Sequence, residues 1–378
     1  MQLKKTISEN FKWVEDVFQK IDKKLSVVSK RSQNKLPYTT VNGIHVDYQP
    51  YFWTSGFWGG LNCLMYEATG KEIYKETALK AQSLLDKAFE SFDELHHDVG
   101  FMWHLSSVAL YRLFGYKDSR TRGLIAASIL SSRFNVKGKY IRAWNGVVRG
   151  DDSKGLTIID TMLNLPLLYW ASKETGDDRF YNVAVAQADM TIKEHVREDY
   201  TVNHVVVHDP KTGKKIVVRA GQGYSENSAW ARGQSWALYG FVLSYIHTND
   251  ERYLNIAKGV ADNFIKESEK TNWLVKLDFR QPEEPKYYDA SAAAIASCGL
   301  IELAKILSDT EGEKYLSSAI NILKATEKEW GDWDENTDSI IVGSSESYAG
   351  GRHKNIIYGD FYFVEAILKL KGREFLIW

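Results

Sequence analysis

The sequence predicts an all-helical fold built from helical hairpins, with one small β-hairpin inserted among them. Apolar residues recur at helical spacing through most of the chain, a short turn motif recurs between neighbouring helices, and one segment has the pattern of two paired strands. The periodicity predicts twelve helices, near residues 6–27, 56–69, 72–90, 98–115, 118–134, 157–175, 178–196, 227–248, 250–268, 288–308, 311–330 and 357–371. These helices form six pairs if the first pairs with the last.

The turn motif occurs at residues 69–74, 175–181, 248–253 and 311–315. In each copy we expect Gly or Asn to end one helix in a left-handed conformation, acidic residues to begin the next helix, and a tyrosine to pack back onto the turn. This recurrence indicates a degenerate repeat of helical hairpins with insertions.

The inserted β-hairpin is predicted at residues 203–208 and 215–219, which flank the turn-forming residues 209–213. A second long connection, residues 135–155, is rich in glycine and charge and contains Trp144. Because no Pro/Ser-rich linker divides the chain, we expect residues 1–378 to form a single domain.

Every second helix begins with an unusual cluster of polar and aromatic residues. If the hairpins close into a ring, these helices lie inside it, run in the same direction and bring their N-termini to one rim. The sequence therefore predicts one polar site at that rim. The clusters contain Trp53, Asp98, Asp160, Arg232, Asp289 and Asp360.

Composition argues against several classes of partner. The chain has 48 basic and 49 acidic residues, so neither nucleic acid nor an acidic membrane surface is expected as its main partner. No run approaches the roughly 18 apolar residues of a membrane span. The first residues are charged rather than apolar, so we predict no signal peptide and a cytoplasmic location. Cys63 and Cys298 lie among apolar residues and are expected in the core, not in a disulfide or a metal site.

The chain is rich in aromatic residues, with 12 Trp, 21 Tyr and 16 Phe. Most of them must belong to a large core. Several are expected to line a sugar-binding site, because flat aromatic faces pack against the apolar C–H faces of pyranose rings.

Asp98 and Asp160 are the candidate acid–base pair. An Asp in the first turn of a helix is commonly a cap or a partner of the helix dipole. Here, however, both lie in apolar or aromatic sequence, where an ionised carboxylate is costly unless it is used or paired. Two neighbouring carboxylates would raise one pKa, so that the pair could hold a proton at neutral pH.

Arg232 and Trp236 lie four residues apart and so share one helix face. The guanidinium group of Arg232 is suited to bidentate capture of a substrate carboxylate, although pairing with Glu226 or another loop acid is an equal alternative.

We expect no metal and no organic cofactor. The pairs His97/His104 and His204/His208 lack the helical His-Glu arrangement of a zinc site, and no cysteine stands nearby. No phosphate-binding loop or dinucleotide fingerprint is present in the sequence.

At these residues the chain resembles the unsaturated glucuronyl hydrolases of glycoside hydrolase family 88. The likeness extends over nearly the whole chain after about residue 45. Its most specific stretches are residues 97–101 (HDVGF), 159–168 (IDTMLNLPLL) and 230–236 (WARGQSW). The resemblance implies an (α/α)6 barrel, in agreement with the twelve helices predicted from periodicity.

The resemblance also implies the roles of individual residues. Asp160 matches the general acid/base of the family, and Asp98 matches its second catalytic aspartate. The implied substrate-binding residues are Trp53, Trp144, His204, Gln222, Arg232, Trp236 and Tyr348. Ser55 stands where the family commonly has Asp. Residues 352–354 do not reproduce the Ser/Ser/Lys pattern associated with sulfated substrates in streptococcal-type members.

The implied substrate is a small glycosaminoglycan-type oligosaccharide, made by a polysaccharide lyase, that ends in a 4,5-unsaturated uronic acid. One alternative is an unsaturated rhamnogalacturonyl hydrolase, which performs the same chemistry on pectin fragments. Another is a non-catalytic carbohydrate-binding barrel, which the presence of both Asp98 and Asp160 disfavours. A sugar epimerase of the same fold would need a pair of histidine bases, and only His97 is predicted at the rim.

Overall fold

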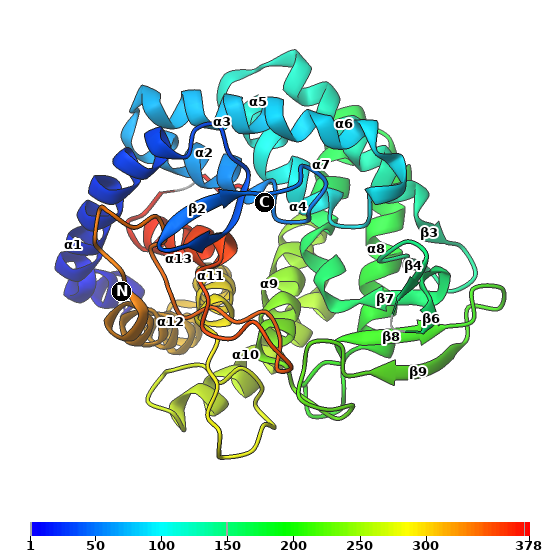
Figure 1. The fold of residues 1–378 in the computed structure, drawn as a ribbon. Helices are drawn as coiled ribbons and strands as arrows, with labels where there is room; N and C mark the ends of the chain where they lie inside the picture. Colours follow the sequence, from blue (N-terminus) through cyan, green and yellow to red (C-terminus); the bar gives the residue numbers. More distant parts are fainter. Residues whose placement is uncertain (1, 149, 374) are drawn as a thin grey trace.

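The computed structural model describes residues 2–148, 150–373 and 375–378. Its helices form two concentric layers, seen down the ring in Figure 1. The inner layer contains α2 (Phe57–Thr69), α4 (Val99–Trp103) continuing into α5 (Ala109–Phe114), α7 (Leu165–Thr175), α9 (Ala231–Thr248), α11 (Ala290–Ile306) and α13 (Ile357–Leu370). The outer layer contains α1 (Gln2–Arg31), α3 (Glu72–Leu85), α6 (Lys117–Ser132), α8 (Asp178–Glu194), α10 (Glu251–Glu269) and α12 (Asp309–Trp330).

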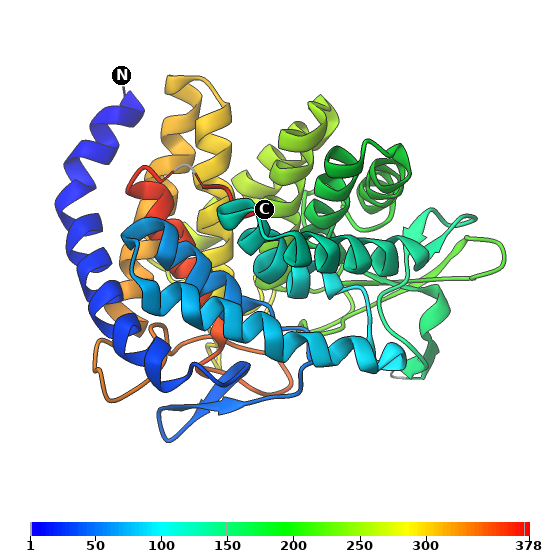
Figure 2. The ribbon, with the colours of Figure 1, turned by 90° about the horizontal axis from the view of Figure 1, so that it is seen from above.

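Contacts between the helices close the inner layer into a ring. Each inner helix contacts the next, and α13 contacts α2. The first helix, α1, lies along the outside against α12 and α13 (Figure 2), so the first and last helices form the sixth pair. Each predicted helix has a counterpart, all but the one predicted at 157–175 at nearly the predicted position, and the predicted (α/α)6 barrel is confirmed.

Burial separates the two layers as the sequence pattern requires. Every residue of α13 is buried, as is every residue of α11 from Ala290 to Ala304. An outer helix such as α10 buries only a stripe, which includes Tyr253, Ala257 and Val260. A helix that is apolar on all sides must lie in the interior, whereas an amphipathic helix covers it.

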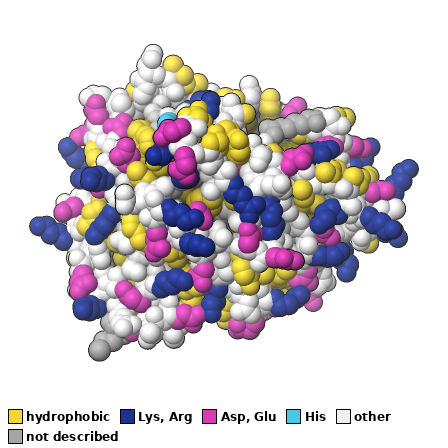
Figure 3. All heavy atoms as spheres, turned by 90° about the horizontal axis from the view of Figure 1, so that it is seen from below, with side chains coloured by type: hydrophobic (Ala, Val, Ile, Leu, Met, Phe, Trp, Pro, Cys, Tyr) yellow, Lys and Arg dark blue, Asp and Glu magenta, His cyan; other side chains and the backbone are white. Residues whose placement is uncertain are grey.

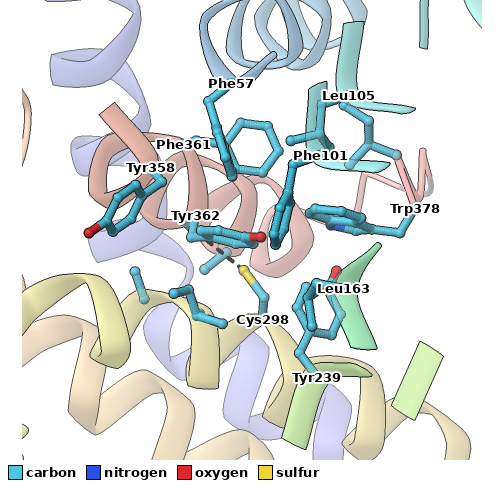
Figure 4. Close-up of a cluster of buried hydrophobic side chains, with 14 of the residues drawn as sticks. Phe57, Phe101, Leu105, Leu163, Tyr239, Cys298, Tyr358, Phe361, Tyr362 and Trp378 are labelled. Carbon is cyan, nitrogen blue, oxygen red and sulfur yellow. Dashed lines mark hydrogen bonds between the residues drawn. The ribbon is translucent and has the colours of Figure 1, made fainter. Parts of the chain in front are cut away.

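Aromatic side chains from several inner helices meet in the core of the ring (Figure 4). The ring of Tyr362 stacks on Trp378, and Phe101 packs between Phe57 and Trp378. The thiol of Cys298 donates to the Tyr362 carbonyl over 3.2 Å. Cys63 and Cys298 are both buried and free, as the sequence predicts.

Most of the predicted turns are confirmed. Left-handed residues end three helices, Gly70 (φ 69°), Gly176 (φ 68°) and Asn249 (φ 56°). The fourth copy differs, because Gly312 lies inside the first turn of α12, which Ser308 caps. A Cβ at Gly312 would lie 2.5 Å from the carbonyl oxygen of Ala304, so this glycine permits close packing of α12 on α11 rather than ending a helix.

The predicted β-hairpin is confirmed, with β8 (Val205–His208) antiparallel to β9 (Lys215–Arg219). A third strand, β7 (Leu156–Ile158), pairs with β8 in a segment that periodicity placed at the start of a helix. The prediction of a helix from residue 157 is therefore wrong. A 3-10 turn (Ile159–Leu163) follows the strand, and α7 begins only at Leu165, because Pro166 is accepted in the first turn of a helix but not in its interior.

The predicted helix at 98–115 is helical over 99–114, but a π turn (His104–Val108) separates α4 from α5. A second hairpin, β1 (Pro37–Val41) and β2 (Ile44–Asp47), was not predicted. Its turn, Asn42-Gly43, has positive φ at both residues and is a strong hairpin signal that helical periodicity does not detect. Two shorter strand pairs are β3 (Phe134–Asn135) with β4 (Tyr140–Ile141) and β5 (Val147–Val148) with β6 (Asp151–Asp152).

Acidic and basic side chains are interspersed over the face shown in Figure 3, in keeping with the balanced charge of the chain. Within the described residues, no helix is both long enough and apolar enough to cross a membrane.

Candidate active site

A cavity of about 680 Å³ opens among the β1–β2 hairpin, the β7–β8–β9 sheet and the starts of inner helices. Five residues predicted to bind substrate line it, namely Trp53, Trp144, His204, Gln222 and Arg232. Trp53 packs on Tyr358 at 4.9 Å between ring centroids, which joins the starts of α2 and α13. The predicted convergence of helix starts is therefore found in the structure.

Asp160 lies in the 3-10 turn before α7, next to the cavity-lining His204. Its Oδ2 atom is 3.5 Å from Nε2 of His204 and accepts no hydrogen bond from any described residue. The side chain is 14% exposed. Oδ2 of Asp160 is therefore a buried oxygen without a hydrogen-bond partner among the described residues, on a carboxyl group that is still partly exposed.

The backbone fixes the orientation of His204. The N–H of Gln222 donates to Nδ1 of His204 over 2.9 Å. Since a backbone N–H can only donate, the neutral ring carries its proton on Nε2, the atom that faces Asp160. Gly221 makes this approach possible, because its φ is +62° and a Cβ there would lie 2.0 Å from Nδ1 of His204.

Asp98 precedes α4 but makes no capping hydrogen bond with its side chain. Oδ1 accepts from the side-chain amide of Asn164 at 2.9 Å, while Oδ2 lies 3.2 Å from Nδ1 of His96 and 3.3 Å from Nε2 of His97. Burial acts to raise the pKa of Asp98, but His97 and His96 together hold that pKa well below its usual range. Asp98 is therefore ionised, and its two nearest titratable neighbours are histidines rather than a second carboxylate.

Arg232 is fully buried and binds groups of the protein itself. Nη1 donates to Oδ2 of Asp289 at 3.0 Å and to the carbonyl of Ser345, and Nη2 donates to the carbonyl of Glu346 at 2.7 Å. The acid that pairs with Arg232 is therefore Asp289 and not Glu226. Arg232 thereby fixes the loop whose Glu346 lines the cavity.

Two aspartates at the rim have structural roles. Asp289 caps α11 by accepting from the backbone N–H of Ser291, besides binding Arg232. Asp360 is buried at the start of α13 and accepts from the backbone N–H groups of Ile340 and Ile341. Burial raises the pKa of Asp360 to about 7 despite these bonds.

Two predicted binding residues lie outside the cavity lining. Trp236 is fully buried and packs on Phe101 and Tyr362 in the core. One helical turn advances about 5.4 Å along the axis, so the face that Arg232 presents at the rim places Trp236 deeper in the ring. Tyr348 does not line the cavity either, and its ring packs on Tyr224 and Tyr287.

Several residues of the site were not predicted. The ring of Trp230 lies between His204, at 4.4 Å, and the guanidinium group of Arg232, also at 4.4 Å. Trp230 is the first residue of the distinctive stretch 230–236 (WARGQSW), and its place in that stretch could have indicated a role in the site. Tyr38 lines the cavity from β1 and donates to Glu346, but its hairpin was missed.

The described residues contain no group of three or more His, Cys, Asp or Glu side chains that could hold a metal ion. Of the histidines considered as metal ligands, His204 faces Asp160 and His208 approaches the carbonyl of Gly155 with Nδ1, at 3.3 Å.

No protein-family model matches the chain. The unsaturated glucuronyl hydrolase of Bacillus sp. strain GL1 is 36% identical over 327 residues, which cover 84% of this chain and 86% of the relative. The chain belongs to the unsaturated glucuronyl hydrolase family. The unsaturated chondroitin disaccharide hydrolase of Streptococcus pneumoniae strain R6 is 33% identical over 336 residues, covering 86% of this chain and 83% of the relative.

The fold of the family agrees with that of the chain. The crystal structure of the Bacillus sp. GL1 unsaturated glucuronyl hydrolase superposes with a TM-score of 0.87 and 33% identity, covering 93% of this chain and 96% of that structure. The family consists of glycoside hydrolases, so the predictions of a hydrolytic enzyme and of its family are both confirmed.

Proposed function

We propose that this protein releases the terminal 4,5-unsaturated uronic acid from lyase-generated glycosaminoglycan-type oligosaccharides. The observation that carries the proposal is the position of Asp160, whose Oδ2 lies 3.5 Å from the cavity-lining His204, with Asp98 joined to the same turn through Asn164. A carboxyl group in the position of Asp160 can give a proton and take one back, and a fixed anion can stabilise developing positive charge.

The relatives support the substrate class. The Bacillus enzyme is described as responsible for the degradation of glycosaminoglycan, and the Streptococcus pneumoniae enzyme is named for unsaturated chondroitin disaccharides. A cavity of about 680 Å³ with aromatic walls is of the size that small ligands occupy in proteins. Both observations favour a short oligosaccharide over a polymer.

The reaction that we propose is hydration of the C4=C5 bond. This bond belongs to a vinyl ether, so a proton added at C4 leaves positive charge at C5, which the ring oxygen shares. Asp160 gives that proton and then accepts one from the water that adds at C5. The resulting hemiketal opens by itself and releases the neighbouring sugar. The rule that relates carboxylate separation to retention or inversion does not apply, because the glycosidic bond is not attacked directly.

The surrounding residues have supporting roles in this scheme. His204 places its Nε2–H 3.5 Å from Oδ2 of Asp160, close enough to influence the acid, and Asp98 stabilises the charge at C5. Arg232 holds the loop of Glu346 through its guanidinium N–H groups, rather than using them to bind the substrate carboxylate. Trp53 and Trp144 provide flat faces for sugar rings in the cavity.

The assignment is tested by incubating the protein with unsaturated disaccharides from chondroitin, hyaluronan, heparin and pectin, and following the loss of ultraviolet absorbance of the conjugated alkene. We expect turnover of a glycosaminoglycan disaccharide. Asp160→Asn should fold and yet lose at least the roughly 10²–10⁴-fold that general acid–base catalysis contributes, because an amide cannot protonate C4. Turnover of the pectin fragment alone would favour the rhamnogalacturonyl alternative, and no turnover of any would favour a binding protein.

Two further expectations belong to the proposal. The single domain of residues 1–378 is a prediction, supported by the inner ring that α13 closes against α2, with α1 packed on its outside. The cytoplasmic location is also a prediction, supported by two free thiols, which are typical of reducing compartments.

A further inference from the structure

We propose that Asn164 is a positioning residue that holds the two catalytic carboxylates in one geometry. This inference rests on the proposed roles of Asp98 and Asp160. The side-chain amide nitrogen of Asn164 donates to Oδ1 of Asp98 at 2.9 Å and approaches the carbonyl oxygen of Asp160 at 3.3 Å. Its Oδ1 accepts from the backbone N–H of Phe101 at 2.8 Å. One side chain thus contacts both of the segments that carry the catalytic aspartates.

The partners determine which way the amide faces. The Phe101 N–H can only donate, and the carboxylate of Asp98 can only accept, so the oxygen must face Phe101 and the nitrogen must face Asp98. Both amide hydrogens and the amide oxygen are then used. Asn164 is fully buried, so water cannot replace these bonds. Among common side chains of this size, only an amide offers two donors and one acceptor here.

The packing around Asn164 leaves little freedom of movement. A Cβ at Gly100 would lie 2.3 Å from Oδ1 of Asn164 and 2.6 Å from its Cα, so the start of α4 contacts the turn before α7 at a glycine. A second bridge runs beside the first. Nδ1 of His97 is 2.9 Å from Oγ1 of Thr161, and its Nε2 is 3.3 Å from Oδ2 of Asp98. Oδ1 of Asp98 is therefore held by a hydrogen bond from Asn164, while Oδ2 lies beside His97.

These contacts predict how substitution of Asn164 changes the reaction. Asn164→Asp keeps an acceptor for Phe101 but places a second carboxyl group within hydrogen-bond distance of Asp98. Two adjacent carboxyl groups compete for one proton, so the pKa of Asp98 rises. Because the proposed mechanism needs ionised Asp98, turnover should be lost at a higher pH as the solution is acidified. Asn164→Ser replaces the two amide donors with one shorter hydroxyl and adds no charge, so it should lower kcat and leave that pH limb in place.

The experiment measures kcat and KM against pH for the parent, Asn164→Asp and Asn164→Ser, with melting temperature as the check of folding. We expect a roughly 10–100-fold loss of kcat with a smaller change in KM, as for misplaced catalytic groups. For Asn164→Asp the acidic limb should move up by about one pH unit or more.

Asn62→Asp is the matched control. Asn62 is likewise buried, within the inner helix α2, and its amide donates to the Trp58 carbonyl and accepts from Ser29. It should lower the melting temperature and leave the acidic limb unmoved. The inference is overturned if Asn164→Ser keeps the kcat of the parent, or if Asn164→Asp moves the limb no further than Asn62→Asp does.

Asp98→Asn and Asp160→Asn, assayed alongside, distinguish a failure of the catalytic roles from a failure of the positioning role of Asn164. If both of these variants keep turnover, the proposed catalytic roles are wrong whatever the Asn164 variants do. If both lose turnover while the Asn164 variants match the parent, only the positioning role of Asn164 fails.

Discussion

The substitution Arg232→Lys tests whether a buried guanidinium group orders the wall of the cavity. Arg232 binds three acceptors, namely Oδ2 of Asp289 and the carbonyls of Ser345 and Glu346, and it also packs on the Trp230 ring. Lysine keeps the charge but offers a single nitrogen on a flexible stem, so it cannot reach all three acceptors in the geometry of a fork. The loop of Glu346 should therefore lose part of its attachment.

The magnitude follows from the number of bonds lost. If lysine retains the pairing with Asp289, two hydrogen bonds from a charged donor are lost. Each is worth about 1.5–3 kcal/mol, so the total is about 3 kcal/mol at the lower end. That energy corresponds to about a hundredfold if it is expressed wholly in the transition state. We expect it to be shared, with a lower free energy of unfolding and at least a tenfold fall in kcat/KM.

The assay combines urea unfolding with steady-state kinetics on an unsaturated disaccharide. Arg252→Lys on the outer helix α10 is the control, because Arg252 is exposed and pairs with Asp189 and Asp250 at the surface. That variant should match the parent in both measurements. If Arg232→Lys has the stability and the kcat/KM of the parent, the guanidinium fork is dispensable and the reasoning is refuted.

Three further predictions concern the same site. Gly221→Ala should lower kcat roughly 10–100-fold, because the new Cβ would displace His204. The control is Gly70→Ala, which has a similar positive φ but nothing within 4 Å of the new Cβ, so it should lower only the stability. Equal kinetics in the two variants would contradict this prediction. Asp98→Asn should lower turnover strongly and move the alkaline limb of the pH–rate profile to lower pH, because a nearby anion favours the protonated form of a general acid. An unmoved alkaline limb in this variant would make Asp98 a binding residue only. Folding lowers the pKa of Asp98, so the ionised group should stabilise the parent fully when the pH is above the ordinary Asp pKa of 3.8, and this stabilisation should be lost as the pH falls below that value. Dialysis against a strong chelator should leave activity unchanged, and activity restored by added zinc or calcium would overturn the expected absence of a metal.

The sequence by itself predicted the features that a few neighbouring residues encode. Helix positions follow from apolar periodicity, and the turns at Gly70 and Asn249 follow from residues that tolerate a left-handed backbone. The hairpin of β8 and β9 follows from alternation around a turn. The candidate residues Asp98, Asp160 and Arg232 were found because polar groups stood at helix starts in apolar sequence.

Only the tertiary structure decided the contacts between distant segments. Arg232 pairs with Asp289, 57 residues away, and Nδ1 of His204 is bound by a backbone N–H 18 residues away. The strand β7 forms where periodicity favoured a helix, because β8 lies beside it and completes its hydrogen bonds. Trp236 shares a helix face with Arg232 and is nevertheless core, because depth within a ring depends on where the neighbouring helices end. Such contacts depend on how the ring closes, which no local pattern of residues specifies.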